Sequence, residues 1–235
     1  MELHQVVHKL HQLADADKVI YKERKFGIIT KNSLGIYHKD LSLLAKEIGK
    51  NNLLAVQLFD TGIYEARILC SKIYDPKDAT EELLEKWVKT FDNWEICDSF
   101  SMGIFAKSKF ALAKILEWTS RKPEFEKRAG FAILASYCMA DKKAENEIFE
   151  QLLPIISREA SDERLYVKKS VNWALRNIGK RNIDLRNSAI RTAQKIQEQN
   201  SVSAKWIAAN ALRELQNKNV RSSDYPRSIY RPVYV

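Results

Sequence analysis

Residues 166–182, YVKKSVNWALRNIGKRN, have the spacing of an amphipathic helix. Apolar side chains recur every three or four positions, which gathers them on one side of an α-helix. The stripe consists of Val167, Val171, Leu175 and Ile178. A helix with one apolar stripe is stable only when a neighbouring element covers that stripe. The segment therefore predicts a helix that packs on one side and faces solvent on the other.

The same spacing continues through the rest of the chain, and no strand-like alternation of useful length interrupts it. It predicts helices at residues 2–14, 16–25, 39–49, 51–60, 62–75, 79–91, 94–106, 107–119, 123–140, 143–158, 162–178, 183–198 and 201–216. Short links favour antiparallel pairs, and each pair leaves an apolar face that only the next pair can cover. The predicted fold class is all-α, an α-α superhelix or solenoid of stacked helix pairs with a long concave groove.

Start and stop signals accompany several of these helices. Asp78 with Glu81 has the spacing of a cap at one helix start, and Ser201 can cap another. Gly179 follows Ile178, in the place of a glycine that ends a helix in the left-handed conformation. These signals predict where the corresponding helices begin and end.

The last predicted helix, 201–216, contains a tryptophan on its expected apolar stripe. Trp206 continues the spacing of Val202 toward Ala209 and Leu212. We therefore expect the indole of Trp206 to have a structural role in the core.

We predict a single helical-repeat domain over residues 1–216. Hydrophobic residues make up 45% of the chain, enough for a continuous core. The final segment, residues 217–235, breaks the helical spacing with two prolines and carries four basic residues. We expect this basic C-terminal tail to be extended or disordered, although its arginine and tyrosine side chains can also contact nucleic acid.

The sequence also argues against several classes of protein. The three cysteines lack the spacing of a disulfide framework or a zinc site, which suits a reducing cytosol. We see no signal peptide, and no apolar run approaches the ~20 residues of a membrane span. His4, His8 and His11 have a spacing that can hold a metal, but no cysteine or carboxylate cluster supports a site there. We therefore expect no membrane contact, no metal and no cofactor.

The net charge of +9 is unevenly distributed. Residues 1–157 hold 23 basic and 23 acidic side chains, whereas residues 158–235 hold 16 basic and 7 acidic ones. A local cationic field attracts a polyanion, most often nucleic acid. The alternative is a well-solvated surface, because many soluble proteins are mildly basic.

The segment FDNWEICDSF, residues 91–100, contains a candidate ligand site. Trp94 and Asp98 are four residues apart and share one helix face, away from the apolar stripe that contains Ile96 and Phe100. An indole beside a carboxylate suits a flat cationic ligand. The alternative is that Trp94 packs locally and Asp98 pairs with an arginine.

The quoted segment 166–182 supplies a second candidate, for DNA binding. Trp173 lies opposite the apolar stripe, with Lys169 and Arg176 on the same polar side. Lys180 and Arg181 follow directly and belong to the same basic group. Such cations can contact phosphates while the indole meets a sugar or a base. The alternative is that this face packs against another helix.

A third candidate is Arg128, at the leading edge of a helix that is apolar nearly all round from Ala129 onward. Such a helix is expected to be buried within the stack. The guanidinium of Arg128 either pairs with a carboxylate, for which Asp98 is available, or points into the groove toward phosphate. The sequence leaves both uses open.

Taken in order, five segments between roughly residues 16 and 215 resemble the AlkD-type DNA alkylation-repair family. They are KFGIITKNSLGIYHKDLSLLAKEI (25–48) with a Leu-Gly-Ile turn, YEARILCSKIY (64–74) with a Glu-Ala-Arg triplet, FDNWEICD (91–98) with Trp-x-x-x-Asp, KRAGFAIL (127–134) with Arg-Ala, and VNWALRNIGK (171–180) with Trp-x-x-Arg. The last is the most specific single match. The resemblance implies a solenoid of HEAT-like repeats.

The resemblance also implies roles for particular residues. Asp98 matches the carboxylate that supports cleavage of the glycosidic bond, and Trp94 and Trp173 match the aromatic residues of the cationic-base site. Arg128 matches the arginine that holds the DNA backbone, and Arg176 fits a DNA-contacting position. These residues are expected to converge in one cleft although they come from separate helix pairs.

Four positions depart from the family pattern. Asn93 stands where active members often have a second tryptophan, and Glu95 is a conservative acidic choice after Trp94. Phe125 replaces an expected tryptophan, and His38 stands where the family often has proline. These changes leave the rate and the preferred lesion open, and some relatives have lost activity.

The resemblance thus implies a DNA glycosylase that excises positively charged N3- or N7-alkylated purines from double-stranded DNA. One alternative is a weak or inactive relative that binds DNA, or branched DNA structures, through the same basic groove. Another is a helical-repeat scaffold for proteins, against which the C-terminal charge excess speaks. We expect a monomer that acts in the bacterial cytosol and nucleoid.

Overall fold

The computed structural model describes residues 1–226 and divides the chain into two compact units, Met1–Lys109 and Phe110–Val235. Every regular element among the described residues is helical, so the all-α prediction is confirmed for them. The division lies inside residues 1–216, the range that we predicted as one domain. Each predicted helix has a counterpart whose ends differ by a few residues.

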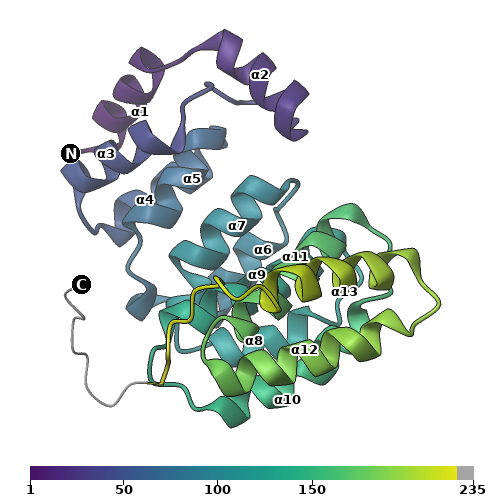
Figure 1. Cartoon of the computed structure of the whole chain (residues 1–235). Helices are drawn as coiled ribbons and strands as arrows, with labels where there is room; N and C mark the ends of the chain where they lie inside the picture. The colour runs from purple at the N-terminus through teal and green to yellow at the C-terminus, as the bar shows by residue number, and fades with distance from the viewer. Residues whose placement is uncertain (227–235) are drawn as a thin grey trace. The chain divides into compact units, whose positions relative to one another are not determined.

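The first unit is built from seven α-helices and two 3₁₀ turns within its described residues: α1 (Leu3–Gln12), α2 (Ala16–Phe26), α3 (His38–Ile48), α4 (Asn52–Asp60), α5 (Tyr64–Ile73), η1 (Pro76–Asp78), α6 (Glu81–Val88), α7 (Trp94–Gly103) and η2 (Phe105–Lys107). Helix α5 packs against α3 and against α7, which makes these three helices one layer (Figure 1). Helix α4 packs against α5 from another side.

The second unit repeats this arrangement with α8 (Ala111–Trp118), α9 (Glu124–Ala140), α10 (Asn146–Glu159), α11 (Leu165–Gly179), α12 (Ile183–Gln197) and α13 (Val202–Leu215). Helices α9, α11 and α13 form one layer, because α11 packs against both of the others. Helix α8 covers α9, while α10 and α12 pack against each other and against α11 (Figure 1). Neighbouring pairs thus bury the faces that the amphipathic pattern leaves apolar.

Side-chain caps explain where many of the helices begin. A side-chain oxygen accepts a hydrogen bond from the backbone N–H three residues later at Asp15, Asn51, Thr80, Asn93, Asn182 and Ser201. The prediction for Ser201 is confirmed. The prediction for Asp78 is wrong, because this residue ends the turn η1 and Thr80 caps α6 instead.

Gly179 serves a different purpose from the one we predicted. It is the last residue of α11, and the capping residue after it is Lys180, in right-handed helical conformation. A Cβ at Gly179 would lie 2.7 Å from Cδ1 of Leu215 on α13. The glycine therefore lets α11 and α13 approach closely and does not provide a left-handed cap.

The predicted buried stripes are largely confirmed. All four apolar residues quoted from residues 166–182 are completely buried, and so are Ile96 and Phe100 on α7. The predicted stripe on α13 is wrong. Val202 and Trp206 are 76% and 40% exposed, and the apolar residues that are buried there are Ala204, Ile207, Ala208, Ala211 and Leu215.

The connection between α2 and α3 is held by one buried carboxylate. Glu65 on α5 is 0% exposed and accepts hydrogen bonds from Ser33 Oγ and from the backbone nitrogens of residues 34, 35 and 36. Gly35 has a φ of +75°, and a Cβ there would lie 2.0 Å from the Asp15 carbonyl oxygen. The Leu-Gly-Ile turn and the Glu-Ala-Arg triplet of the sequence thus contact each other, because the glutamate of the triplet accepts hydrogen bonds from the backbone of the turn.

The described part of the tail, residues 217–226, runs along the second unit. Ser223 and Tyr225 donate backbone hydrogen bonds to the carbonyl oxygens of Lys180 and Arg181. This part contains no helix, as the sequence predicts. The rest of the predicted tail lies outside the described residues.

Candidate active site and DNA-binding residues

Helix α7 presents the indole and the carboxylate that the sequence singles out. Asn93 caps the helix by accepting a hydrogen bond from the backbone nitrogen of Ile96 at 3.1 Å. The apolar side of α7 is buried in the first unit, whereas Trp94 and Asp98 are half-buried. The helical-wheel prediction for this segment is therefore confirmed.

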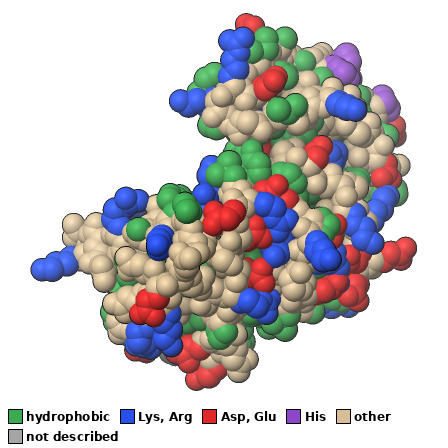
Figure 2. Space-filling view, turned by 90° about the vertical axis from the view of Figure 1, so that its right-hand side faces the viewer, with side chains coloured by type: hydrophobic (Ala, Val, Ile, Leu, Met, Phe, Trp, Pro, Cys, Tyr) green, Lys and Arg blue, Asp and Glu red, His purple; other side chains and the backbone are tan. Residues whose placement is uncertain are grey.

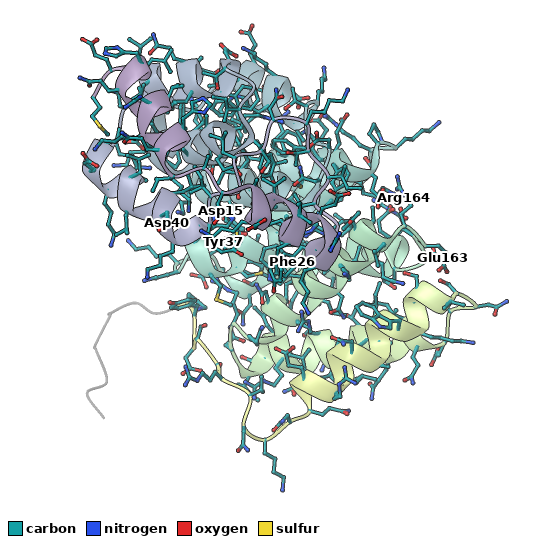
Figure 3. The ribbon with its side chains drawn as sticks, turned by 90° about the horizontal axis from the view of Figure 1, so that it is seen from above. Asp15, Phe26, Tyr37, Asp40, Glu163 and Arg164 are labelled. Carbon is teal, nitrogen blue, oxygen red and sulfur yellow. The ribbon has the colours of Figure 1, made fainter. Side chains whose placement is uncertain are left out.

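The Trp94 ring is oriented by the end of α2. Its Nε1–H donates a hydrogen bond of 3.0 Å to the carbonyl oxygen of Phe26. Phe26, labelled in Figure 3, is the last residue of that helix. The Phe26 ring is 45% exposed and meets the Tyr21 ring edge to face at 5.8 Å. The sequence does not single out this exposed aromatic pair, because both residues fit an ordinary amphipathic helix.

A cavity of about 510 Å³ brings Trp94 and Asp98 together within the first unit. Its polar lining also includes the imidazole of His38 and three lysines: Lys50, Lys72 and Lys107. An aromatic face, a carboxylate and several ammonium groups are the components that an alkylated, phosphate-bearing nucleotide would require. We did not predict the lysines, because they come from three separate segments in a part of the chain with no net charge.

Beside the cavity, Glu95 forms the centre of a buried polar network. Its carboxylate lies 2.8 Å from Lys22 Nζ, 3.1 Å from His38 Nε2 and 2.8 Å from the Tyr64 hydroxyl. Burial alone would raise the Glu95 pKa. Hydrogen bonds from its three partners and the Lys22 charge outweigh burial and lower the pKa to about 2. Glu95 is therefore an ionised structural anchor that joins α7 to α2, α3 and α5.

Two of the cavity lysines have pKa values below the usual range. Burial lowers the pKa of Lys72, whose Nζ donates to Ser42 Oγ at 3.2 Å. Burial also lowers the pKa of Lys50; the nearby charge of Asp75 opposes this shift, and the charge of Lys107 adds to it. Lys50 Nζ donates to the carbonyl oxygens of Lys72 and Tyr74 at 3.1 and 2.7 Å, at the C-terminal end of α5.

Helix α11 and its C-cap carry the predicted DNA-binding group of the second unit. Trp173 is half-buried and Lys169 is exposed, on the side opposite the buried stripe. Arg176 and Lys180 both pair with Glu214 of α13, the latter at 3.0 Å. This carboxylate offsets part of the positive charge that the segment shows in the sequence.

Two predicted DNA-binding arginines lie in the interior of the second unit. Arg181 is 0% exposed and donates to the carbonyl oxygens of Cys138 and Asp141 at 2.6 and 2.7 Å, so the prediction that it contacts DNA is wrong. Its guanidinium also lies 4.2 Å from the centre of the Phe149 ring. Arg128 is 6% exposed and donates to the Tyr166 carbonyl oxygen at 2.7 Å.

The burial of these arginines has a simple cause. Arginine next to an apolar helix can satisfy backbone carbonyls of the adjacent loop, and spacing alone does not distinguish that use from phosphate binding. The role of Arg128 toward DNA stays a prediction. So does the convergence of Trp94 and Asp98 with Arg128 and Trp173, since these two pairs belong to different units.

An exposed tryptophan, which we expected in the core, lies near the N-terminal end of α13. Trp206 is 40% exposed, and Lys168 Nζ of the neighbouring helix α11 lies 5.4 Å from its ring centre. An exposed indole next to a cation is a suitable surface for a nucleotide. The signal available in the sequence was the alternative stripe of small residues on α13.

The surface and the helices provide further observations. Lys and Arg side chains are interspersed with Asp and Glu on the face that Figure 2 shows, so this face is not uniformly basic. Within residues 1–226, no helix combines the length and the hydropathy that a membrane span requires. No group of three or more His, Cys, Asp or Glu side chains in that range has the geometry of a metal site.

A comparison with models of protein families shows to which family this chain is related. The model of a family described as DNA alkylation repair enzyme matches residues 6–215. The chain belongs to the DNA alkylation repair enzyme family. Both candidate groups, on α7 and on α11, lie within the matched range. A comparison with curated proteins finds no match.

A solved structure is similar to this DNA alkylation repair family member over nearly all of both chains. The TM-score is 0.76 at 19% sequence identity, and the match covers 95% of this chain and 98% of the other. That protein is described as a member of a new family related to the HEAT-like repeat DNA glycosylases, with affinity for branched DNA structures. The likeness confirms the predicted solenoid of HEAT-like helix pairs.

Proposed function

We propose that this protein is a DNA glycosylase that excises positively charged N3- or N7-alkylated purines from duplex DNA. The observation that supports this most is the pairing of Trp94 and Asp98 on one face of α7, in one cavity. Membership of a DNA alkylation repair family supports the same conclusion. The protein is expected to act as a monomer in the cytosol.

The chemistry follows from the charge of the lesion. Alkylation at N3 or N7 places a positive charge on the purine and makes it a good leaving group. Cleavage of the N-glycosidic bond then moves positive charge to the sugar. A fixed carboxylate close to that sugar lowers the barrier electrostatically, which is the role we assign to Asp98. The same carboxylate can orient the water that attacks the anomeric carbon.

The indole of Trp94 supplies a complementary interaction. The electron-rich face of the ring attracts both the cationic base and the developing sugar cation. The hydrogen bond to the Phe26 carbonyl fixes the indole, so this interaction needs little reorganisation during the reaction. We assign the same role to Trp173 of the second unit, whose indole face would also attract the cationic base.

Cations of the second unit would hold the DNA backbone. Lys169 is exposed on α11, and Arg176 and Lys180 are half-buried beside Glu214. Contacts of this kind position the duplex without selecting a sequence. Selection would then come from the positive charge of the damaged base.

A second candidate function is the binding of branched DNA without base excision. The similar solved structure supports it, because that protein is described as having affinity for such DNA. The two functions share a DNA-binding surface and differ in whether a base is released. We favour excision because a carboxylate in the cavity does not assist the binding of a polyanion.

One experiment separates the two functions. The purified protein is incubated with methylated duplex DNA, and free 3-methyladenine and 7-methylguanine are measured by chromatography against DNA incubated alone. Binding to a four-way junction and to a linear duplex of the same length is measured in parallel. Release of methylated bases supports the glycosylase. Junction binding without any release would favour the second function.

A further inference from the structure

The cavity beside Asp98 contains more positive charge than a base-recognition site needs. Three lysines line it, from the α3–α4 link, from α5 and from η2: Lys50, Lys72 and Lys107. Within residues 1–226, none of the three forms an ion pair with a carboxylate. Ammonium groups that line one cavity without an ion-pair partner attract an anion.

Lys72 is the clearest case. Its ammonium group is half-buried on α5, and burial lowers its pKa without any opposing contribution from a carboxylate. Its hydrogen bond to Ser42 Oγ uses one of its three N–H donors. A partly desolvated ammonium group with two remaining donors is suited to bind an oxyanion.

Lys50 and Lys107 add two further ammonium groups to the lining of the same cavity. Lys50 is held in place by two carbonyl oxygens at the end of α5, which leaves one N–H donor. Lys107 lies close enough to contribute to the lowered Lys50 pKa by charge repulsion, although Asp75, which does not line the cavity, acts in the opposite direction. Its exposed side chain makes no hydrogen bond within the described part of the chain.

The acids of the cavity do not cancel this charge. Glu95 is buried and paired with Lys22, at 2.8 Å. Asp98 is the other carboxylate in the lining, which thus contains three lysines and only one carboxylate besides Glu95. A carboxylate that acts on a deoxyribose is repelled by the negatively charged phosphates on both sides of that sugar. Nearby cations would offset this repulsion.

We propose that Lys72, Lys107 and Lys50 form a binding site for a backbone phosphate of the damaged strand, next to the sugar on which Asp98 acts. This inference rests on the proposed function and adds a DNA contact in the first unit, where the sequence has no net charge. The site positions the lesion strand through its backbone and reads no base. The site would bind the backbone of any duplex, whether or not the duplex contains a damaged base.

The test is the salt dependence of DNA binding. The dissociation constant for an undamaged linear duplex is measured from about 50 to 300 mM KCl for the wild type and for Lys72→Met and Lys107→Met. Removal of one lysine–phosphate interaction is expected to reduce the slope of log K against log salt by about 0.9. Because the three lysines share one phosphate, each variant is expected to show a shallower slope than the wild type, by up to about 0.9.

Matched variants keep this test specific. Lys72→Arg retains the charge and is expected to keep the wild-type slope. Lys46→Met removes an exposed lysine of α3 outside the cavity and is also expected to keep it. Wild-type slopes for both cavity variants would overturn the phosphate site, even if the protein excises bases. Shallower slopes would support the site, even if no base is released.

Discussion

Single residues in the first unit hold the helices around the cavity. Glu95 and Glu65 are both buried carboxylates, yet they use different partners. Glu95 has a lysine, a histidine and a tyrosine, whereas Glu65 binds a hydroxyl and three backbone N–H groups. In each case, removing the charge leaves donors without an acceptor in a buried place, which is costly.

The Glu95 carboxylate is expected to make stability depend on acid pH. Its pKa in the folded protein is about 2, below the ordinary value of 4.5. The ionised group therefore stabilises the fold above pH 4.5, and this contribution is lost as the pH falls toward 2. At 1.36 kcal/mol per pKa unit, it amounts to about 3 kcal/mol. Glu95→Gln should reduce the difference in the free energy of unfolding between pH 7 and pH 3.

Urea denaturation of both proteins at these pH values measures this difference. An unchanged pH dependence in Glu95→Gln would contradict the assignment of Glu95 as an ionised anchor.

Replacing Glu65 tests the turn before α3. Glu65→Gln keeps the size of the side chain but loses the charge that four donors share, and it is expected to destabilise the protein by about 2 to 3 kcal/mol. Chemical denaturation at pH 7 measures the change. Glu47→Gln, which breaks an exposed ion pair with Lys9, serves as the control and should cost under about 1 kcal/mol. Equal effects of the two substitutions would disprove the anchoring role of Glu65.

Close contacts between helices set the shape of the cavity. A Cβ at Gly103 of α7 would lie 2.4 Å from the carbonyl oxygen of Ser71 on α5, and both residues line the cavity. Gly103→Ala gains about 1 kcal/mol of helix propensity but is expected to lose more through the clash, for a net destabilisation of about 1 to 2 kcal/mol. Thermal or urea denaturation measures it. A stabilised variant would show that α5 and α7 can separate at no cost.

Helices α11 and α13 are coupled by Glu214, which binds both Arg176 and Lys180. If these cations contact phosphate, the carboxylate competes with DNA for them. Glu214→Gln is therefore expected to tighten duplex binding by about 1 kcal/mol, roughly fivefold in Kd, and less at high salt. Fluorescence anisotropy with labelled duplex measures this change. Glu198→Gln, an exposed acid at the C-cap of α12, should have little effect.

Weaker binding by Glu214→Gln at every salt concentration would contradict a phosphate role for Arg176 and Lys180.

For the whole molecule, the sequence predicts the positions of the helices well, because apolar residues recur at three- and four-residue spacings in most of them. Trp94, Asp98 and Trp173 could be placed on their helix faces for the same reason. Arg181 could not, because a guanidinium that binds backbone carbonyls has the same spacing as one that faces solvent. The lysines of the cavity were missed, because only the folded chain brings Lys50, Lys72 and Lys107 together.

Asp98→Asn tests the central claim most directly. The substitution keeps the size of the side chain and removes the charge that would stabilise the sugar cation. The measurement is the single-turnover rate of 7-methylguanine release from a duplex with one lesion, at saturating protein, together with the Kd for that duplex. We predict a rate at least about 100-fold below that of the wild type, with a similar Kd. A variant that excises the base at the wild-type rate would contradict the account.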